Sequence, residues 1–196
     1  MKALAEQLRP LLLTPQAAIA LDVHGTMDAA VLLALFVRSD SLHVVLTRRR
    51  DDLRRHPGEI SFPGGRPDIE GEDLLTTALR EADEEIGLPR GAVEIVGALP
   101  PTPTLATNYS VYPFVGLIAD GHEWIASPTE VAEILEVDLD SLRSAFERRQ
   151  FTRRGITFES DAYTVGDHVI WGATARILGD LFDRISPLLD AQLSRP

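Results

Sequence analysis

The chain contains no cysteine, which excludes disulfide bonds and thiol chemistry and fits a protein of the cytoplasm. It also lacks a long hydrophobic run, because the longest one, Ala29 to Val37, falls far short of the roughly 20 residues that span a bilayer. A net charge of −11 leaves no general basic face for nucleic acid. We therefore expect a cytoplasmic protein that binds neither nucleic acid nor membrane.

The N-terminal Met1 to Leu13 has leucines at helical spacing, but Glu6 and Arg9 interrupt it, unlike the apolar core of a signal peptide. Pro10 should shorten or kink this helix, which we expect to pack on the core. A helix lying on a membrane surface is the less favoured alternative. The five histidines are scattered, without the spacing of metal ligands.

The 196 residues form one domain, 1–196, since no repeat, low-complexity tract or clear linker divides them. Strand-like and helical patterns alternate irregularly, which predicts a mixed sheet flanked by helices rather than a doubly wound fold. The expected strands are 30–37, 42–47, 93–99, 111–119, 156–159 and 168–171, and the expected later helices are 139–149 and 172–193.

The most informative stretch runs from Phe62 to Leu88. Two glycines, Gly64 and Gly65, precede a loop and then an apolar pattern of helical period. Acidic residues near Asp73 favour a helix start, and Gly87 is a favourable residue for its end. We predict a glycine loop followed by a helix over 73–87.

Three glutamates share one side of that helix. Glu81, Glu84 and Glu85 stand at i, i+3 and i+4, so their carboxylates project together despite their mutual repulsion. Hard oxygen ligands gathered in this way suit Mg²⁺ or Mn²⁺. From spacing alone, a solvated acidic face explains the pattern about as well.

The longer string R-E-A-D-E-E-I-G-L, from Arg80 to Leu88, resembles the second half of the Nudix box residue for residue. The first half resembles it with one departure, since six residues rather than five separate Gly65 from Glu72. We interpret this as a loop lengthened by one residue. The resemblance implies an α/β/α sandwich with a mixed β-sheet and a loop–helix–loop catalytic motif.

An arginine cluster precedes the glycine loop and supplies the local basic patch that an acidic protein needs for an anionic substrate. Its members are Arg48, Arg49, Arg50, Arg54 and Arg55. For any single one of these, a solvated loop is the simpler interpretation. The string from Val45 to Gly65 is similar to the signature of the coenzyme A pyrophosphatase subfamily, with Arg49, Arg54 and Gly58 in register. Arg50 departs from it, because the subfamily has a small residue there.

These resemblances imply metal-dependent hydrolysis of the diphosphate linkage of coenzyme A, giving 3′,5′-ADP and 4′-phosphopantetheine. Glu81, Glu84 and Glu85 would hold Mg²⁺ or Mn²⁺, and Glu81 or Glu84 would act as the general base. Glu72 and Arg80 would hold the carboxylates in place. Substrate would meet the arginine and glycine positions Arg48, Arg49, Arg54, Gly64 and Gly65.

Several alternatives stay open. The substrate could be another nucleoside diphosphate derivative, such as NADH or ADP-ribose, or the chain could be a non-catalytic module that only binds nucleotides. One of Glu130, Glu133 and Glu136 could add a ligand or base, although a solvated helical turn is the favoured interpretation of 129–136. Acylated or oxidised coenzyme A as substrate, the number of metals and a homodimer are also undecided.

Overall fold

The computed structural model describes residues 1–21, 27–53, 56–104, 108–153 and 155–193. Within them, eight strands form one mixed sheet with the main order β3-β2-β1-β7-β5. Strands β1 and β7 are parallel, with Met27 opposite Tyr109 and Leu35 opposite Leu117, and the other pairs in this sheet are antiparallel. The bounds are β1 Met27–Arg38, β2 Ser41–Arg49, β3 Ile60–Ser61, β4 Gly64–Gly65, β5 Glu94–Ala98, β6 Thr102–Pro103, β7 Tyr109–Leu117 and β8 Val131–Asp138.

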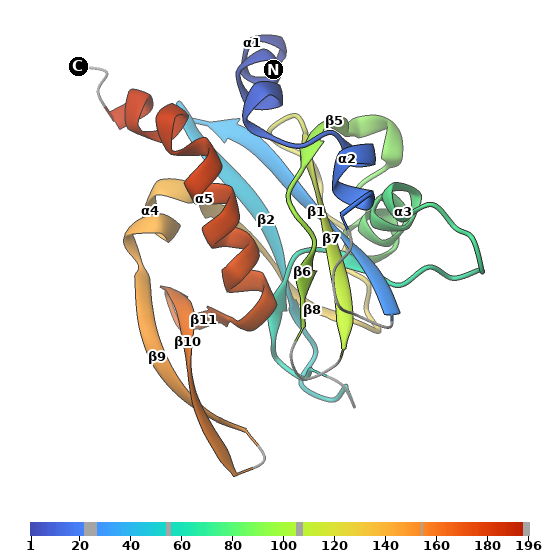
Figure 1. Ribbon diagram of the computed structural model, residues 1–196, viewed down its shortest axis with the longest axis vertical. Helices are drawn as coiled ribbons and strands as arrows, with labels where there is room; N and C mark the ends of the chain where they lie inside the picture. The colour runs from blue at the N-terminus through green and yellow to red at the C-terminus, as the bar shows by residue number, and fades with distance from the viewer. Residues whose placement is uncertain (22–26, 54–55, 105–107, 154, 194–196) are drawn as a thin grey trace.

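Helices cover both faces of this sheet, as predicted (Figure 1). Helix α3, Leu74–Ile86, lies on one face and helix α5, Gly172–Leu193, on the other. Strand β1 separates two cores because alternate side chains point to opposite faces. Leu33 and Leu35 join the core on the α5 side, while Leu32 and Phe36 join the core under α3. The remaining helices are α1 Lys2–Leu8, α2 Pro15–Ile19 and α4 Leu139–Ser144, with short 3₁₀ turns η1 Arg9–Leu11 and η2 Arg90–Ala92.

Helix α3 begins and ends where the sequence predicts. The Asp73 side chain accepts a hydrogen bond from the Thr76 backbone N–H, which satisfies a free donor of the first turn. Gly87 ends the helix in the left-handed conformation, with φ of 68°. Buried Ala78, Ala82 and Ile86 hold the helix on the sheet, so its carboxylate-bearing side is fixed relative to β1 and β4.

Two predicted helical segments are strands. Residues 129–136 mostly belong to β8, which pairs antiparallel with β2, with Val44 opposite Val137. Helix α4 ends at Ser144 rather than Arg149, and Phe146–Arg153 forms strand β9. In both places the chain is rich in β-branched or aromatic residues, and pairing with a neighbouring strand outweighs local helical spacing.

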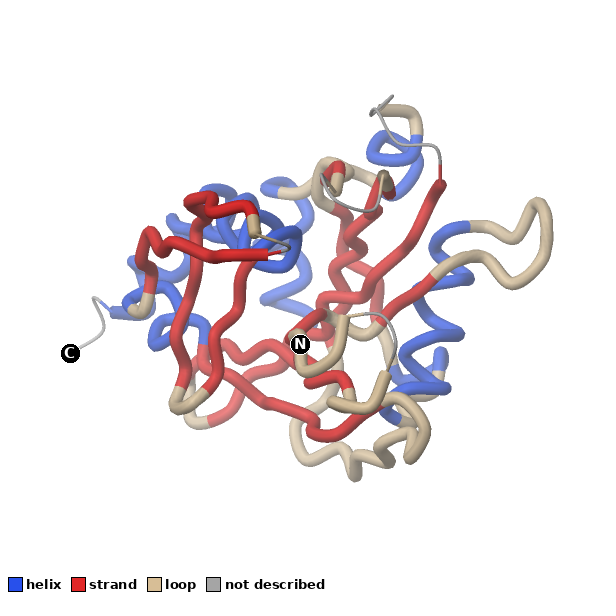
Figure 2. Tube along the Cα trace, turned by 90° about the horizontal axis from the view of Figure 1, so that it is seen from below, coloured by secondary structure: helices blue, strands red, loops and turns tan. Residues whose placement is uncertain are grey.

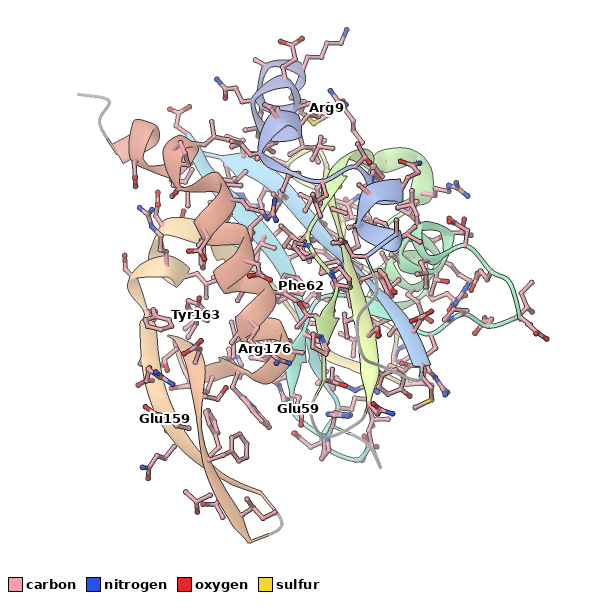
Figure 3. The ribbon with its side chains drawn as sticks, in the orientation of Figure 1. Arg9, Glu59, Phe62, Glu159, Tyr163 and Arg176 are labelled. Atoms are coloured by element: carbon pink, nitrogen blue, oxygen red, sulfur yellow. The ribbon has the colours of Figure 1, made fainter. Side chains whose placement is uncertain are left out.

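A second sheet of three strands, in the order β11-β10-β9, lies beside α5 and extends away from the body (Figures 1 and 2). Strand β10, Ile156–Val165, extends beyond the predicted 156–159, and its end from Ala162 to Val165 pairs antiparallel with β11, His168–Trp171. Tyr163 points from β10 toward α5 (Figure 3), with its ring 5.7 Å from that of Phe182. This sheet brings the β10–β11 turn next to the end of β2.

In the described part of the chain, no helix is both long enough and apolar enough to cross a membrane.

Candidate active site

The three glutamates of α3 differ sharply in environment. Glu85 is buried, with 5% of its surface exposed. The side chain of Glu81 is 15% exposed and that of Glu84 is 57% exposed. The acidic side of the helix is therefore not simply a solvated face, because two of its carboxylates are removed from water.

Arg80 holds two of these carboxylates. Its Nη1 lies 3.0 Å from Glu81 Oε1 and 3.2 Å from Glu84 Oε2. Its Nη2 also donates to the Arg66 carbonyl oxygen at 3.0 Å. One guanidinium thus joins the helix to the preceding loop, and its rigid fork limits where the carboxylates can lie.

Glu72 anchors Arg80 from the other side. Its Oε1 accepts from Arg80 Nε at 3.0 Å, and its Oε2 accepts from Arg80 Nη2 at 3.1 Å and from the Asp68 N–H at 3.0 Å. Hydrogen bonds from Arg80, and then from the Asp68 backbone, lower the pKa of Glu72 to about 2. Glu72 is therefore ionised at any physiological pH and acts as a fixed counter-charge.

The loop between β4 and α3 projects from the body (Figure 1). Its base is held at Arg66 and Asp68 by the contacts with Arg80 and Glu72. Ile69 at its tip is 70% exposed, and a side chain at Gly71 would meet nothing within 4 Å. A loop with such a tip has room for an additional residue without moving Glu72 from Arg80.

The two glycines of β4 touch the site in different ways. The Gly64 N–H donates to Glu85 Oε2 at 3.3 Å. A Cβ atom at Gly65 would lie 2.3 Å from Glu81 Oε1, so the carboxylate occupies the space that a side chain would need. The backbone at these positions is close to two of the predicted ligands because it carries no side chain.

Burial dominates the electrostatics of the site. Desolvation raises the pKa of Glu85 to about 8, opposed by the Gly64 hydrogen bond and by the charge of Arg49. Burial also raises the pKa of Glu81, with Arg80 opposing. The negative charge of Glu81 also raises the pKa of Glu85, so a cation placed near both carboxylates would stabilise their ionised forms.

One of the three glutamates around β8 faces this site. The negative charge of Glu130 raises the pKa values of both Glu81 and Glu85. Glu136 instead binds Arg38 and the Trp124 indole, and Glu133 lies 3.3 Å from His168 Nε2. The candidate extra ligand or base is therefore Glu130.

The arginine cluster is divided by the sheet. Arg48 lies on the face of Leu46, where it lines a cavity of about 360 Å³ with Glu133 and His168. Its Nη1 is already 3.0 Å from Asp51 Oδ1. Arg49 lies on the α3 face, where its charge acts on Glu85. Its buried Nε has no hydrogen-bond partner among the described residues.

Arg50, the other described member of the cluster, is held elsewhere. Arg50 is engaged by Asp52 and by the Pro128 carbonyl. The predicted substrate contact Arg54, and Arg55 beside it, lie outside the described residues. Among the described members of the cluster, Arg49 is the one whose charge acts on Glu85.

The donor set fits a hard divalent cation. Carboxylate oxygens from Glu81 and Glu85, with Glu84 and Glu130 nearby, are ligands that Mg²⁺ and Mn²⁺ prefer. Among the described residues, however, no three His, Asp or Glu side chains are already gathered as a metal-binding group. Arg80 contacts one oxygen of Glu81 and one oxygen of Glu84.

The sequence did not point to Thr77, whose buried hydroxyl lies 2.9 Å from Glu72 Oε2. Nor did it predict that the β10–β11 turn brings His168 to Glu133. A polar residue among the apolar positions of α3 was the available signal for Thr77.

A mixed sheet between helices carries a glycine loop that leads into a helix with clustered carboxylates, an arrangement suited to a metal-dependent hydrolase. The family model described as "NUDIX domain" matches residues 27–156. "Uncharacterized Nudix hydrolase NudL" of Enterobacter sp. (strain 638) is 38% identical over 162 residues, covering 82% of this chain and 83% of that one. The protein of the same name from Photorhabdus laumondii is 37% identical over 159 residues, covering 80% and 84%.

The fold agrees with a solved structure. The crystal structure of a MutT/nudix family protein from Enterococcus faecalis superposes with a TM-score of 0.57 at 16% identity, covering 89% of this chain and 70% of that one. The chain belongs to the Nudix family, and it is a Nudix hydrolase, a pyrophosphatase.

Proposed function

We propose that this Nudix hydrolase cleaves the diphosphate linkage of coenzyme A to 3′,5′-ADP and 4′-phosphopantetheine. The observation that carries the proposal is the signature from Val45 to Gly65, which leads directly into the catalytic helix. The position of Arg49 toward Glu85 supports it, since a cation beside the carboxylates can meet the phosphates of the substrate. We also place the enzyme in the cytoplasm.

In this proposal Glu81, Glu84 and Glu85 hold Mg²⁺ or Mn²⁺. The bound ion would neutralise the charge of the diphosphate and lower the pKa of the attacking water. Arg80 and Glu72 limit the positions of the carboxylates, and the backbone of Gly64 and Gly65 allows close approach of the phosphate.

The general base is Glu81, Glu84 or Glu130. Each lies on or faces the carboxylate cluster, and a base must reach the water that attacks phosphorus. Arg80 neutralises part of the charge on Glu81 and Glu84, whereas Glu130 contributes a carboxylate from outside the helix. Replacing each by Gln and comparing the pH dependence of kcat would identify the base, because its loss removes the acidic limb of the profile.

A substrate screen tests the proposal. Coenzyme A, its thioesters and disulfide, NADH and ADP-ribose would be incubated with Mg²⁺ or Mn²⁺, and phosphate released by added phosphatase would be measured. We expect the highest kcat/KM with a form of coenzyme A. A preference for NADH or ADP-ribose would assign the alternative substrates, and no turnover of any compound would favour a non-catalytic nucleotide-binding module.

The position of bond cleavage provides a second test. In ¹⁸O-labelled water, attack on phosphorus puts the label in one of the two phosphate-containing products. Attack on carbon would instead leave an intact diphosphate and label an alcohol. Recovery of a diphosphate product would rule out the proposed reaction.

A further inference from the structure

Thr77 is a fully buried polar residue on the core side of α3, with 0% of its surface exposed. Its Oγ1 lies 2.9 Å from Glu72 Oε2 and 3.3 Å from the Asp73 carbonyl oxygen. A hydroxyl has one proton to donate. The shorter contact, to an ionised carboxylate, is the stronger hydrogen bond.

This hydrogen bond differs in origin from the other bonds to Glu72. One of those comes from the backbone of Asp68, in the projecting loop, and two come from the long side chain of Arg80. Thr77 donates from the first turn of a helix packed on the sheet, through a short side chain. It therefore ties Glu72 directly to the buried side of the helix that carries the carboxylates.

We propose that Thr77 is a positioning residue for the metal-binding carboxylates. Its hydroxyl fixes Glu72, Glu72 fixes the guanidinium of Arg80, and Arg80 sets the positions of Glu81 and Glu84. The inference rests on the proposed function to the extent that these carboxylates hold the metal.

Packing between α3 and the sheet does not by itself require a hydroxyl group at position 77. Valine has nearly the same volume and would fill the same space between α3 and the sheet without a buried polar group. The hydroxyl donates its hydrogen bond to Glu72, which belongs to the site. Its removal should therefore affect metal binding rather than folding.

Three variants test this. Thr77→Val removes the hydroxyl and keeps the shape, Thr77→Ser keeps the hydroxyl, and Thr76→Val is the matched control. Thr76 is the preceding residue, and its hydroxyl donates to Asp73 rather than to Glu72. Where Thr77→Val fails to fold, Thr77→Ala removes the same hydroxyl with a residue that favours helices.

The first measurement is the affinity of the whole protein for Mn²⁺ alone, followed by electron paramagnetic resonance of the free ion. Loss of groups that orient metal ligands lowers metal affinity by roughly ten- to a hundredfold. Because Thr77 acts two contacts further away, through Glu72 and then Arg80, we expect the lower end of this range, about a tenfold loss in Thr77→Val. Thr77→Ser and Thr76→Val should stay within about twofold of the wild type. Thermal unfolding without metal should be similar in all of them.

A double variant tests whether Thr77 acts through Glu72. Once Glu72→Gln has removed the charged acceptor, adding Thr77→Val should change Mn²⁺ affinity little further, because both act through one contact. Equal Mn²⁺ affinity in wild type and Thr77→Val would overturn the proposal, as would a Thr77→Ser variant as weak as Thr77→Val. Because this measurement uses no substrate, failure of the coenzyme A proposal would show separately, as absent turnover in a wild type that still binds Mn²⁺.

Discussion

Glu81 occupies the space in which a side chain at Gly65 would have to lie. A Cβ atom there would be 2.3 Å from Glu81 Oε1 and 2.5 Å from its carboxyl carbon. The obstacle is the end of a flexible side chain, so Gly65→Ala should fold and displace the carboxylate. We expect a fall in kcat of roughly tenfold to a hundredfold, since one predicted metal ligand is moved, and near-normal unfolding by urea.

Two other glycines provide the comparison for that variant. A Cβ atom at Gly64 would lie 2.3 Å from the Ala30 carbonyl oxygen, which belongs to the rigid backbone of β1, so Gly64→Ala should lower stability. A Cβ atom at Gly91 would meet nothing within 4 Å, and Gly91→Ala should change neither property. Full activity in Gly65→Ala would show that Glu81 can leave this position without affecting the chemistry.

Glu85→Gln tests the buried ligand. Glutamine keeps the shape and can still accept the Gly64 hydrogen bond, but it removes the charge that would bind the metal. We expect kcat at saturating Mg²⁺ to fall roughly a hundredfold or more, as when one key electrostatic contact to a transition state is lost. Turnover close to wild type would remove Glu85 from the site.

The stability of the metal-free protein should depend on pH because of the same residue. The pKa of Glu85 is raised from 4.5 to about 8 in the folded state, so the folded state binds more protons than the unfolded state between these values. Its stabilising contribution is therefore complete below about pH 4.5 and is lost as pH rises toward 8, by an amount on the order of a few kcal/mol. Glu81, whose pKa is also raised, acts in the same direction.

Urea unfolding at pH 5, 6.5 and 8, with a chelator present, measures this dependence. Glu85→Gln should reduce it and should be more stable than wild type at pH 8. Glu72 does not interfere, since its lowered pKa contributes stability that is lost only as pH falls below about 4.5 toward 2. An identical pH dependence of stability in wild type and Glu85→Gln would show that Glu85 is not its source.

The catalytic helix could be predicted from the sequence because its determinants are local. Asp73 and Gly87 fix its ends, and the spacing of Glu81, Glu84 and Glu85 fixes their common side. Local spacing could not show that Glu85 is buried while Glu84 is exposed, because that depends on how β4 passes over the helix. Contacts between distant segments decide such differences.

The strands were harder to predict for the same reason. The glutamate spacing from Glu130 to Glu136 suits a helical turn, yet pairing with β2 makes most of that segment a strand. The arginine cluster was predicted as one patch, but alternation along β2 sends Arg48 and Arg49 to opposite faces. The position of each residue in its strand, rather than its place in a motif, decides which arginine faces Glu85.

The placement of Arg48 and Arg49 on opposite faces of the sheet leads to a specific prediction for substrate recognition. Arg48 is already paired with Asp51 and lies 3.7 Å from Glu133, so little of its charge is available to a phosphate. Arg49 lies on the side of the carboxylates, and no described residue forms a hydrogen bond with its buried Nε. Coenzyme A differs from dephospho-coenzyme A only by its 3′-phosphate, and a charge-assisted hydrogen bond contributes about 1.5–3 kcal/mol.

We therefore expect Arg49→Ala to lower kcat/KM for coenzyme A by roughly tenfold to a hundredfold, and much less for dephospho-coenzyme A. Arg48→Ala, the matched control on the adjacent residue, should change both substrates by only about twofold. A rise in KM with kcat nearly unchanged would show that Arg49 stabilises the bound substrate and the transition state equally. Equal losses on both substrates would instead assign Arg49 to the diphosphate, because only a contact with the 3′-phosphate can distinguish the two.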